Sequence, residues 1–292
     1  MSSEQWTVKR LLEWTREFFR SKGIEKPLLE AEILLSTAMK IKRIEIYTNY
    51  ETEPDESQRA VFRDFVKRRG NGEPAAYLAG YKEFYSLSFK VDKHVLIPRP
   101  ETEDLVLKTL DILKTYPDGS RLTVADIGTG SGAVAVALAK NLPPNAAEAK
   151  IFAVDINCEA LSLAKQNAET NGAAEQITFR QSDLLGSVAE LLDVIVANLP
   201  YVSEAEYDML PSDVRSYEPK PALLAGKTGT EIIERLIYQS ADRLKDGGHI
   251  LLEVSPMIAG AVKDAAAGLA GGRKNAEIIL DSYNRERIVH IW

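Results

Sequence analysis

One stretch near the middle of the chain constrains its fold more than any other. The short apolar run Leu122–Ile127 predicts a buried strand, and the loop Gly-Thr-Gly-Ser-Gly at 128–132 follows it at once. Ala133–Lys140 carries Ala, Val and Leu at helical spacing, so the loop opens a helix, which two prolines end. A second apolar run, Ile151–Val154, predicts another strand with Asp155 at its carboxyl end. Strand, glycine loop, helix, strand and acid form half of a nucleotide-binding βαβ unit.

The spacing of the glycines limits which kind of cofactor the loop could bind. Dinucleotide-binding loops use G-x-G-x-x-G, whereas this loop reads G-x-G-x-G. Asp126, just before the first glycine, would repel a pyrophosphate but attract a cationic group such as an ammonium or a sulfonium. The carboxylate of Asp155 offers acceptor oxygens to both hydroxyls of a ribose. The pattern therefore favours S-adenosylmethionine, and a glycine turn in an ordinary α/β domain is the alternative.

Two further positions complete the predicted cofactor site. Asp183 follows the third predicted strand, where a carboxylate can accept the adenine amino group, and Leu184 can pack on the ring. A plain helix cap is the alternative explanation for Asp183. The predicted cofactor-binding residues are Asp126, Gly128, Thr129, Gly130, Ser131, Gly132, Asp155, Asp183, Leu184 and Asn198.

Composition excludes several classes of protein. The 292 residues allow one large domain, or a small and a medium one. The single cysteine, Cys158, excludes internal disulfides and cysteine-based metal clusters, and the three histidines are far apart, so no metal is expected. The N-terminus lacks an apolar core and no apolar run could span a membrane, so we expect a cytoplasmic protein without a signal peptide.

The net charge of −7 is unevenly distributed. Residues 1–100 carry 18 Lys and Arg against 15 Asp and Glu, whereas the rest carry 18 against 28. A nucleic-acid binder usually shows a strong basic stripe, and this chain shows only local clusters such as 67–69. We therefore do not expect a nucleic-acid partner.

The first quarter of the chain predicts a small helical bundle. Aromatic and apolar residues recur at helical spacing over 4–72, with helices expected up to Gly23, over Leu28–Met39 and Ile41–Tyr47, and from Asp55 onward. Residues 81–91 alternate like a β-hairpin and are followed by a rigid, proline-bounded segment that contains Arg99. A helix is expected over Glu101–Leu113.

Beyond Asp155 the strand and helix signals continue to alternate. Helical segments are expected at Asn157–Asn171, Val188–Leu192, Gly229–Leu244 and Pro256–Leu269, and strands at Ile177–Arg180, Asp193–Ala197, His249–Val254, Ala276–Leu280 and Arg287–Trp292. The last two strands have a short connection and must form an antiparallel hairpin. The pattern predicts an α/β fold and fits the class I, Rossmann-like, seven-stranded methyltransferase layout. We predict three parts: a helical bundle at 1–74, to which the family resemblance described below gives a substrate-binding role, a β-hairpin linker at 75–100 and the methyltransferase domain at 101–292.

A tetrapeptide after the fourth predicted strand carries the expected chemistry. Asn198-Leu199-Pro200-Tyr201 should share a cleft with the glycine loop, because ligands bind beyond the carboxyl ends of parallel strands. Asn198 offers a side-chain carbonyl, Leu199 a backbone carbonyl that the following proline holds extended, and Tyr201 a flat face. Together they could grip a planar NH2 group, such as an amide or aromatic amine, for methylation. A polar loop is the alternative.

These residues resemble the peptide chain release factor glutamine methyltransferase family, HemK/PrmC, along nearly the whole chain. The matching motifs are Gly72-Glu73-Pro74, Tyr77-Leu78, Gly80, Glu83-Phe84, VLIPRPETE at 95–103, DIGTGSG at 126–132, Asp155, Ser182-Asp183 and DVRSYEP at 213–219. The resemblance implies methyl transfer from S-adenosylmethionine to the amide nitrogen of the glutamine in the Gly-Gly-Gln motif of class I release factors.

The resemblance also implies residue roles. It assigns Asn198, Leu199, Pro200 and Tyr201 to the glutamine side chain, as catalytic and substrate-binding residues, and Arg99 of the VLIPRPETE motif joins the substrate site. The bundle would hold other parts of the release factor, and we expect a monomer that yields S-adenosylhomocysteine as product.

Two departures from the family pattern stand out. The tetrapeptide is usually Asn-Pro-Pro-Tyr, and here Leu199 replaces a proline. Because that position contributes a backbone carbonyl, we expect activity to survive with a looser pocket. The strand at His249–Val254 is usually followed by glycine, and here Ser255-Pro256 follows. This change affects loop geometry more than chemistry.

Three alternatives stay open. The tetrapeptide would suit a flipped adenine, so an N6-adenine or other exocyclic-amine methyltransferase acting on nucleic acid is the alternative enzyme. A non-enzymatic alternative is a scaffold that binds the cofactor but has lost catalysis, and the replacement of a motif proline by Leu199 would be the sign of that loss. A nicotinamide oxidoreductase is disfavoured by the glycine spacing.

Overall fold

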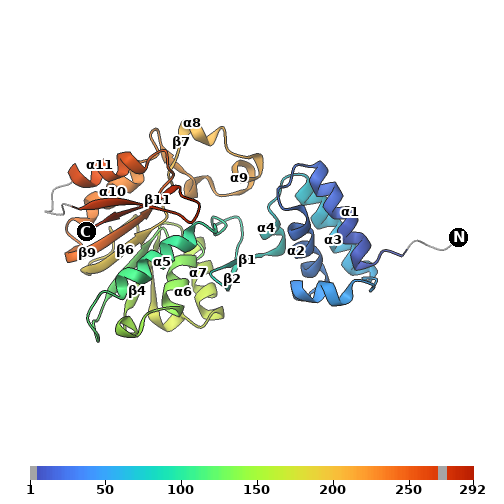
Figure 1. The fold of residues 1–292 in the computed structure, drawn as a ribbon, viewed down its shortest axis with the longest axis horizontal. Helices are drawn as coiled ribbons and strands as arrows, with labels where there is room; N and C mark the ends of the chain where they lie inside the picture. Colours follow the sequence, from blue (N-terminus) through green and yellow to red (C-terminus); the bar gives the residue numbers. More distant parts are fainter. Residues whose placement is uncertain (1–4, 269–274) are drawn as a thin grey trace. The chain divides into compact units, whose positions relative to one another are not determined.

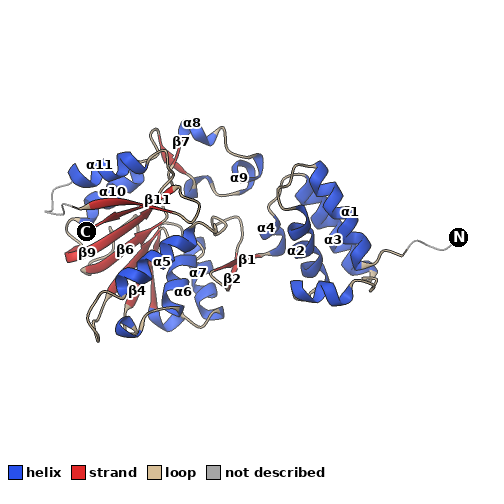
Figure 2. Cartoon of the chain, in the orientation of Figure 1, coloured by secondary structure: helices blue, strands red, loops and turns tan. Residues whose placement is uncertain are grey.

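The computed structural model describes residues 5–268 and 275–292, which form two compact units. The first comprises residues 1–80 together with 212–217, and the second comprises residues 81–211 and 218–292. Figure 1 labels the elements along the chain, and Figure 2 separates helices from strands.

The N-terminal unit is the predicted helical bundle. It contains α1 (Val8–Ser21), α2 (Pro27–Met39), the 3₁₀ helix η1 (Arg43–Asn49), α3 (Glu56–Gly70), α4 (Ala75–Ala79) and the separate α9 (Ser212–Tyr217). Asp55 caps α3 by accepting from Gln58 N at 2.8 Å, as its position before the helix predicts. Phe19, Leu34 and Leu35 are fully buried between the helices. The apolar residues that recur at helical spacing in the sequence therefore form the core of the bundle, as predicted.

A short helix precedes the predicted hairpin. The hairpin pairs β1 (Tyr81–Phe84) with β2 (Leu87–Lys90), as predicted. Within the range predicted as linker, however, residues 75–79 form α4, which begins after Pro74 and ends at Gly80 with a φ of 79°. Proline before a helix and a left-handed glycine after it are ordinary end signals, but a helix of one turn leaves no apolar period to detect.

The second unit is built on a seven-stranded sheet with the order β10-β11-β9-β6-β3-β4-β5. Its strands are β3 (Thr123–Ile127), β4 (Lys150–Asp155), β5 (Ile177–Gln181), β6 (Leu192–Ala197), β9 (Leu244–Glu253), β10 (Ala276–Leu280) and β11 (Glu286–Ile291). β11 runs antiparallel to both of its neighbours, and the other neighbouring strands are parallel. The predicted sheet and its closing hairpin are confirmed.

Helices cover both faces of this sheet (Figure 1). One face packs against α5 (Thr102–Leu113), α6 (Ala133–Lys140) and α7 (Cys158–Thr170), and the other against α10 (Glu231–Ser240) and α11 (Ala259–Gly268). Side chains along β3 alternate between the two cores, since Val124 lies in the first whereas Ala125 and Ile127 lie in the second. Such two-sided burial explains why the strands read as continuous apolar runs.

One side chain joins the hairpin to the glycine loop. Asn167, buried on α7, accepts from Lys90 N at 2.7 Å and donates from Nδ2 to Lys90 O at 3.0 Å and to Ser131 O at 2.8 Å. Phe84 and Phe89 of the hairpin are buried in the first core of the second unit. The hairpin is therefore part of the second unit.

Several local predictions were wrong. Val188–Leu192 is not helical, because its backbone bonds elsewhere: Val188 O accepts from Arg243 Nε at 2.8 Å, and Leu192 begins β6. Helix α10 ends at Ser240, and Leu244 already belongs to β9. A small sheet of β7 (Val202–Ser203) and β8 (Leu224–Gly226), with α8 (Glu204–Tyr207), was not among the predicted elements.

The last helix of the chain and three short turns complete the description of the fold. The predicted helix Pro256–Leu269 begins at Ala259, and its last residue lies outside the described residues. Three short 3₁₀ turns, η2 (Pro144–Ala146), η3 (Ala174–Gln176) and η4 (Lys220–Ala222), complete the fold. In the described part of the chain, no helix is both long enough and apolar enough to cross a membrane.

A pair of histidines gives the sheet a pH-dependent stability. His249 Nδ1 lies 3.0 Å from His290 Nε2, and His290 Nδ1 lies 3.2 Å from Glu277 Oε1. Burial lowers the pKa of both imidazoles, and the neighbouring His290 lowers that of His249 further. Glu277 partly opposes the lowering at His290, and below pH 6.5 the unfolded chain therefore protonates these rings more readily than the folded chain does.

We expect acidification to destabilise the wild type more than a His249→Asn variant. Burial lowers the pKa values of the two histidines in the folded chain. The stability that their neutral rings contribute to the fold is therefore complete above pH 6.5 and is lost as the pH falls through that value. Thermal denaturation at pH 7.5, 6.5 and 5.5 should show the wild-type Tm falling by about 2 °C or more beyond that of the variant. Parallel Tm curves would contradict this prediction.

Candidate functional site

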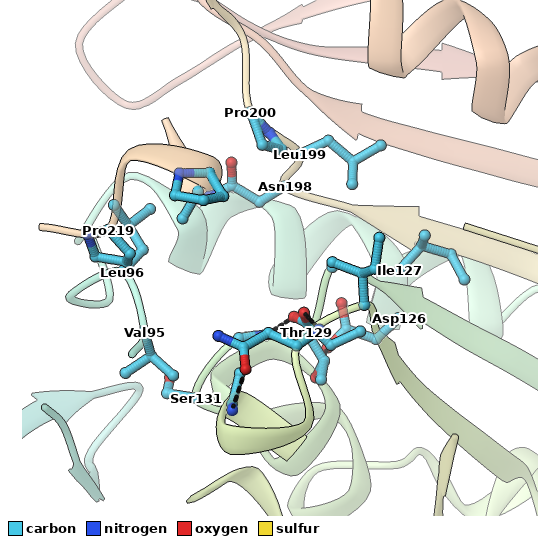
Figure 3. Close-up of a pocket in the computed structure, with 18 of the residues that line it drawn as sticks. Val95, Leu96, Asp126, Ile127, Thr129, Ser131, Asn198, Leu199, Pro200 and Pro219 are labelled. Carbon is cyan, nitrogen blue, oxygen red and sulfur yellow. Dashed lines mark hydrogen bonds between the residues drawn. The ribbon is translucent and has the colours of Figure 1, made fainter. Parts of the chain in front are cut away.

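A cavity of about 430 Å³ lies at the carboxyl ends of β3, β4, β5 and β6, within the second unit. It is lined by the glycine loop and by the residues that follow the other three strands, and Figure 3 shows Asp126, Thr129, Ser131 and Asn198 around it. The segment before α5 and part of α10 complete the wall. The cavity brings together every predicted cofactor-binding residue except Gly132, together with Arg99, Leu199 and Pro200.

The glycine loop takes a conformation that favours glycine. Gly128, Gly130 and Gly132 have φ values of 74°, 54° and 80°. The N–H groups of Gly128 and Thr129 both donate to Val154 O, at 2.8 and 2.9 Å, which fastens the loop to the end of β4. A Cβ on Gly132 would lie 3.0 Å from Ala164 Cβ. The third glycine thus allows α6 and α7 to pack closely.

Asp126 anchors the glycine loop by accepting hydrogen bonds from it and from α6. Its Oδ2 accepts from Thr129 Oγ1 at 2.6 Å and from Ala135 N at 3.1 Å, and its side chain is buried. Burial raises the pKa of Asp126 to about 7, and the negative charge of Asp155 adds to the effect. Because Asp126 also lines the cavity, a cationic ligand there would favour the ionised form.

Asp155 stands at the end of β4, as predicted. Its Oδ2 accepts from Gly130 N at 2.8 Å and its Oδ1 from Asn157 N at 2.9 Å, so the carboxylate is fixed in orientation. Burial raises its pKa. The backbone N–H of Ile156 also acts on this carboxylate, which lines the cavity, where a carboxylate can accept a ribose hydroxyl.

Asp183 and Leu184 line the cavity beyond β5. Asp183 Oδ2 accepts from Arg235 Nη2 at 2.6 Å, and Leu184 is buried with a φ of 51°. In the described chain no helix begins at Asp183, so the helix-cap alternative fails. Sequence reasoning missed Arg235, which lies 52 residues away on α10 and carries no motif.

The tetrapeptide follows β6, and its first three residues, Asn198, Leu199 and Pro200, lie across the cavity from the glycine loop (Figure 3). Asn198 Nδ2 donates to Thr102 Oγ1 at 3.1 Å. The buried Leu199 side chain covers Gly128: a Cβ on that glycine would lie 2.9 Å from Leu199 Cδ2. Leu199, the departure from the family pattern, therefore packs the tetrapeptide tightly against the predicted cofactor loop.

Tyr201 does not line the cavity in this structure. Its ring packs against the second core, and burial together with the negative charge of Glu253 raises the pKa of its phenol to about 12. The chain turns away here because Val202 begins β7, which pairs with β8. This arrangement does not provide the flat face that we predicted from the sequence.

Arg99 reaches the cavity from the proline-bounded segment. Its guanidinium bonds Glu218 Oε1, and Ile97 N donates to Glu218 Oε2 at 3.1 Å. Glu218 is buried, so it fixes the segment and balances the charge of Arg99. No local spacing in the sequence connects Glu218 with Arg99, so only the family motif at 213–219 could have indicated that Glu218 belongs to the site.

This fold and site define an S-adenosylmethionine-dependent methyltransferase. The donor set fits that cofactor: a buried carboxylate, Asp126, beside the loop for a cationic centre, Asp155 for the ribose, and Asp183 with Leu184 for the adenine. Within residues 5–268 and 275–292, no group of three or more His, Cys, Asp or Glu side chains could hold a metal ion.

Comparison with known proteins identifies the family. Residues 10–80 match the PrmC N-terminal domain and residues 104–211 the methyltransferase small domain. The release factor glutamine methyltransferase of Rhodopirellula baltica is 51% identical over 287 residues, covering 97% of this chain and 95% of the relative. That of Moorella thermoacetica is 40% identical and covers 91% of each chain. The chain belongs to the release factor glutamine methyltransferase family.

Solved structures agree on the fold of the chain. The hMettl16 catalytic domain in complex with the MAT2A 3′UTR hairpin 6 is 17% identical with a TM-score of 0.55, covering 78% of this chain and 81% of that one. A methyltransferase from Pyrococcus furiosus is 19% identical with a TM-score of 0.51, covering 72% and 90%. At these identities the likeness concerns the fold alone.

We expect the affinity for S-adenosylmethionine to depend on Asp126 and on pH. Since the pKa of Asp126 is raised to about 7, the attractive charge is present above that pH and is lost below it. Between pH 8 and pH 6, titration calorimetry should show the Kd of the wild type rising by up to about tenfold. In Asp126→Asn the Kd should be weaker throughout and change less. The same pH dependence in both proteins would contradict the role of Asp126.

Proposed function

We propose that this protein transfers the methyl group of S-adenosylmethionine to the side-chain amide nitrogen of a release-factor glutamine. The observation that carries the proposal is the contact between Leu199 and Gly128, with Asn198, Leu199 and Pro200 lining the same cavity as the glycine loop. Membership of the release factor glutamine methyltransferase family supports the choice of substrate. The glutamine we propose is that of the Gly-Gly-Gln motif in class I release factors.

The tetrapeptide supplies two acceptors for the amide N–H groups. Asn198 contributes Oδ1, because its Nδ2 already donates to Thr102, and Leu199 contributes its backbone carbonyl, which Pro200 holds in place. The amide nitrogen is a poor nucleophile because its lone pair is delocalised into the carbonyl. Two accepted hydrogen bonds raise its electron density and direct the nitrogen toward the cofactor.

The cofactor contributes an electrophilic methyl group when it is bound. The chain contributes alignment and a fixed electrostatic environment, which supply most of the rate. No strong base is needed before transfer, since the N–H proton becomes acidic only as the nitrogen gains positive charge. Asp155 and Asp183 fix the nucleoside, so the reacting groups meet in a defined geometry.

A groove on the helical bundle supports a role in holding the release factor. It encloses about 810 Å³ between α1 and α3, and its walls include Trp14, Phe18 and Phe62. Trp14 is 52% exposed and stacks on Phe18 with ring centroids 5.4 Å apart. Exposed aromatic side chains are typical of protein-binding surfaces. The division at residues 74 and 100, the monomeric state and the cytoplasmic location stay predictions.

The direct test is transfer of label from S-adenosylmethionine to a purified bacterial class I release factor. We expect label on the wild-type factor and none on a factor whose Gly-Gly-Gln glutamine is replaced by alanine. Equal labelling of both factors would reject the site of methylation. Label on DNA or RNA instead would favour the exocyclic-amine alternative, and tight cofactor binding without any transfer would favour a silent scaffold.

Two substitutions should separate catalysis from cofactor binding. Asn198→Ala should lower kcat by about 100-fold or more, because an acceptor for the reacting amide is lost, while the Kd for S-adenosylmethionine changes little. Asp155→Ala should raise that Kd by about tenfold or more, since a carboxylate that accepts hydroxyls is removed. Single-turnover kinetics and titration calorimetry measure the two effects. An equal loss of both quantities in Asn198→Ala would show that the residue is misplaced.

A further inference from the structure

A chain of buried polar groups adjoins Asn198 at the edge of the cavity, beginning with Thr102, which also lines it. Thr102, the first residue of α5, is 5% exposed, and Glu253, the last residue of β9, is 1% exposed. Asn198 Nδ2 donates to Thr102 Oγ1 at 3.1 Å. The Thr102 side chain also lowers the pKa of the Glu253 carboxyl as a hydrogen-bonding neighbour, and the register of β6 and β9, which pairs Ala197 with Leu252, brings Glu253 beside Asn198. Three elements distant in sequence thus meet at one amide.

We propose that Thr102 and Glu253 are positioning residues that fix which end of the Asn198 amide faces the cavity. The proposal rests on the proposed function, because it concerns the acceptor that grips the glutamine amide. Glu253 is not among the residues that line the cavity, whereas Thr102 lines it, so the Kd of the cofactor in Thr102 variants separates positioning from direct contact with a ligand. The proposal also gives a reason for a carboxyl to be buried at the end of β9.

The direction of each hydrogen bond follows from the number of protons. A threonine hydroxyl has one proton to donate and can accept at its oxygen. When Glu253 is ionised it can only accept, so Thr102 must donate to it and must accept from Asn198 Nδ2. The amide oxygen of Asn198 is then left to accept an N–H of the substrate.

Protonation of Glu253 would remove this constraint. The protonated carboxyl can donate to the Thr102 oxygen, which frees the hydroxyl proton to point at Asn198. The amide can then turn over and present its NH2 group to the cavity. An NH2 group facing the NH2 of a glutamine offers no acceptor, so this arrangement does not support transfer.

The groups around Glu253 bring its pKa close to neutral pH, so that the protonated and the ionised carboxyl are both accessible. Its Oε2 has no hydrogen-bond partner among the described residues, and burial raises its pKa to about 7. The positive charges of Arg287 on β11 and Arg99 oppose this rise, whereas the negative charge of Glu101 adds to it.

Two further groups complete the titratable environment of Glu253. The phenol of Tyr201, beyond β6, lies within the field of the Glu253 charge, and Asp281 pairs with Arg287 at 3.6 Å. The Tyr201 phenol, with a pKa raised to about 12, stays protonated near neutral pH. Of the buried groups in this cluster, Glu253 is therefore the one that titrates near neutrality.

The decisive measurement is kcat between pH 6 and pH 8.5, with saturating S-adenosylmethionine and release factor at each pH. Saturation removes any effect of Asp126 on cofactor affinity. The wild-type kcat should rise with pH through a midpoint near 7. In Glu253→Gln the amide oxygen can accept from Thr102 at every pH, so the profile should be flat between pH 6 and pH 8.

Substitutions of Thr102 provide a matched pair. Thr102→Val keeps the shape but removes the hydroxyl, and should lower kcat about tenfold or more while the Kd for the cofactor changes less than about threefold. Thr102→Ser keeps the hydroxyl and should restore kcat to within about threefold of the wild type. A role in packing alone would give the opposite order, because serine loses the buried methyl group and valine keeps it.

A second readout does not need substrate. The ¹⁵N resonances of the Asn198 side-chain amide, assigned by their absence from Asn198→Ala, should shift with a midpoint near pH 7 in the wild type and not in Glu253→Gln. A wild type that methylates no release factor but shows this shift would reject the proposed function alone. Identical amide titrations in the two proteins, or full activity with an unchanged pH profile in Thr102→Val, would overturn the positioning role.

Discussion

The attachment of the glycine loop to the end of β4 is the constraint on which the site depends. Two successive N–H groups, of Gly128 and Thr129, converge on the single carbonyl of Val154, and Asp126 ties the other side of the loop to the start of α6. These bonds fix the direction in which α6 leaves the sheet. They also place Asp155, one residue beyond Val154, against Gly130 N. The loop, the helix and the carboxylate of Asp155 are therefore set by one small group of hydrogen bonds.

Sequence reasoning predicted the parts of the molecule in which local pattern and tertiary role agree. The βαβ unit around the loop has two-sided apolar strands and an uninterrupted apolar helix, so periodicity alone was enough to place β3, α6 and β4. The closing hairpin of β10 and β11 followed from the short connection between its strands. The carboxyl-end rule then placed Asp155, Asp183 and Asn198 in one cavity.

The features that were missed depend on contacts between distant residues. Arg235 approaches Asp183 only because α10 packs across the sheet, and Glu218 meets Arg99 across more than a hundred positions. Tyr201 belonged to the expected motif, yet the pairing of β7 with β8 directs its ring to the core. Val188–Leu192 has a helical composition, but an arginine side chain takes one of its carbonyls. None of these contacts has a signal within a short window of sequence.

The side chain of Asn167 has a consequence for how this part of the molecule opens. One amide serves both backbone groups of Lys90 in the hairpin and the carbonyl of Ser131 in the loop, so neither can separate from α7 without breaking its bonds. The hairpin and the loop therefore form one cooperative opening unit, and their backbone amides should exchange hydrogen at a common rate. A ligand that holds the loop closed would protect the hairpin as well, although the hairpin does not touch it.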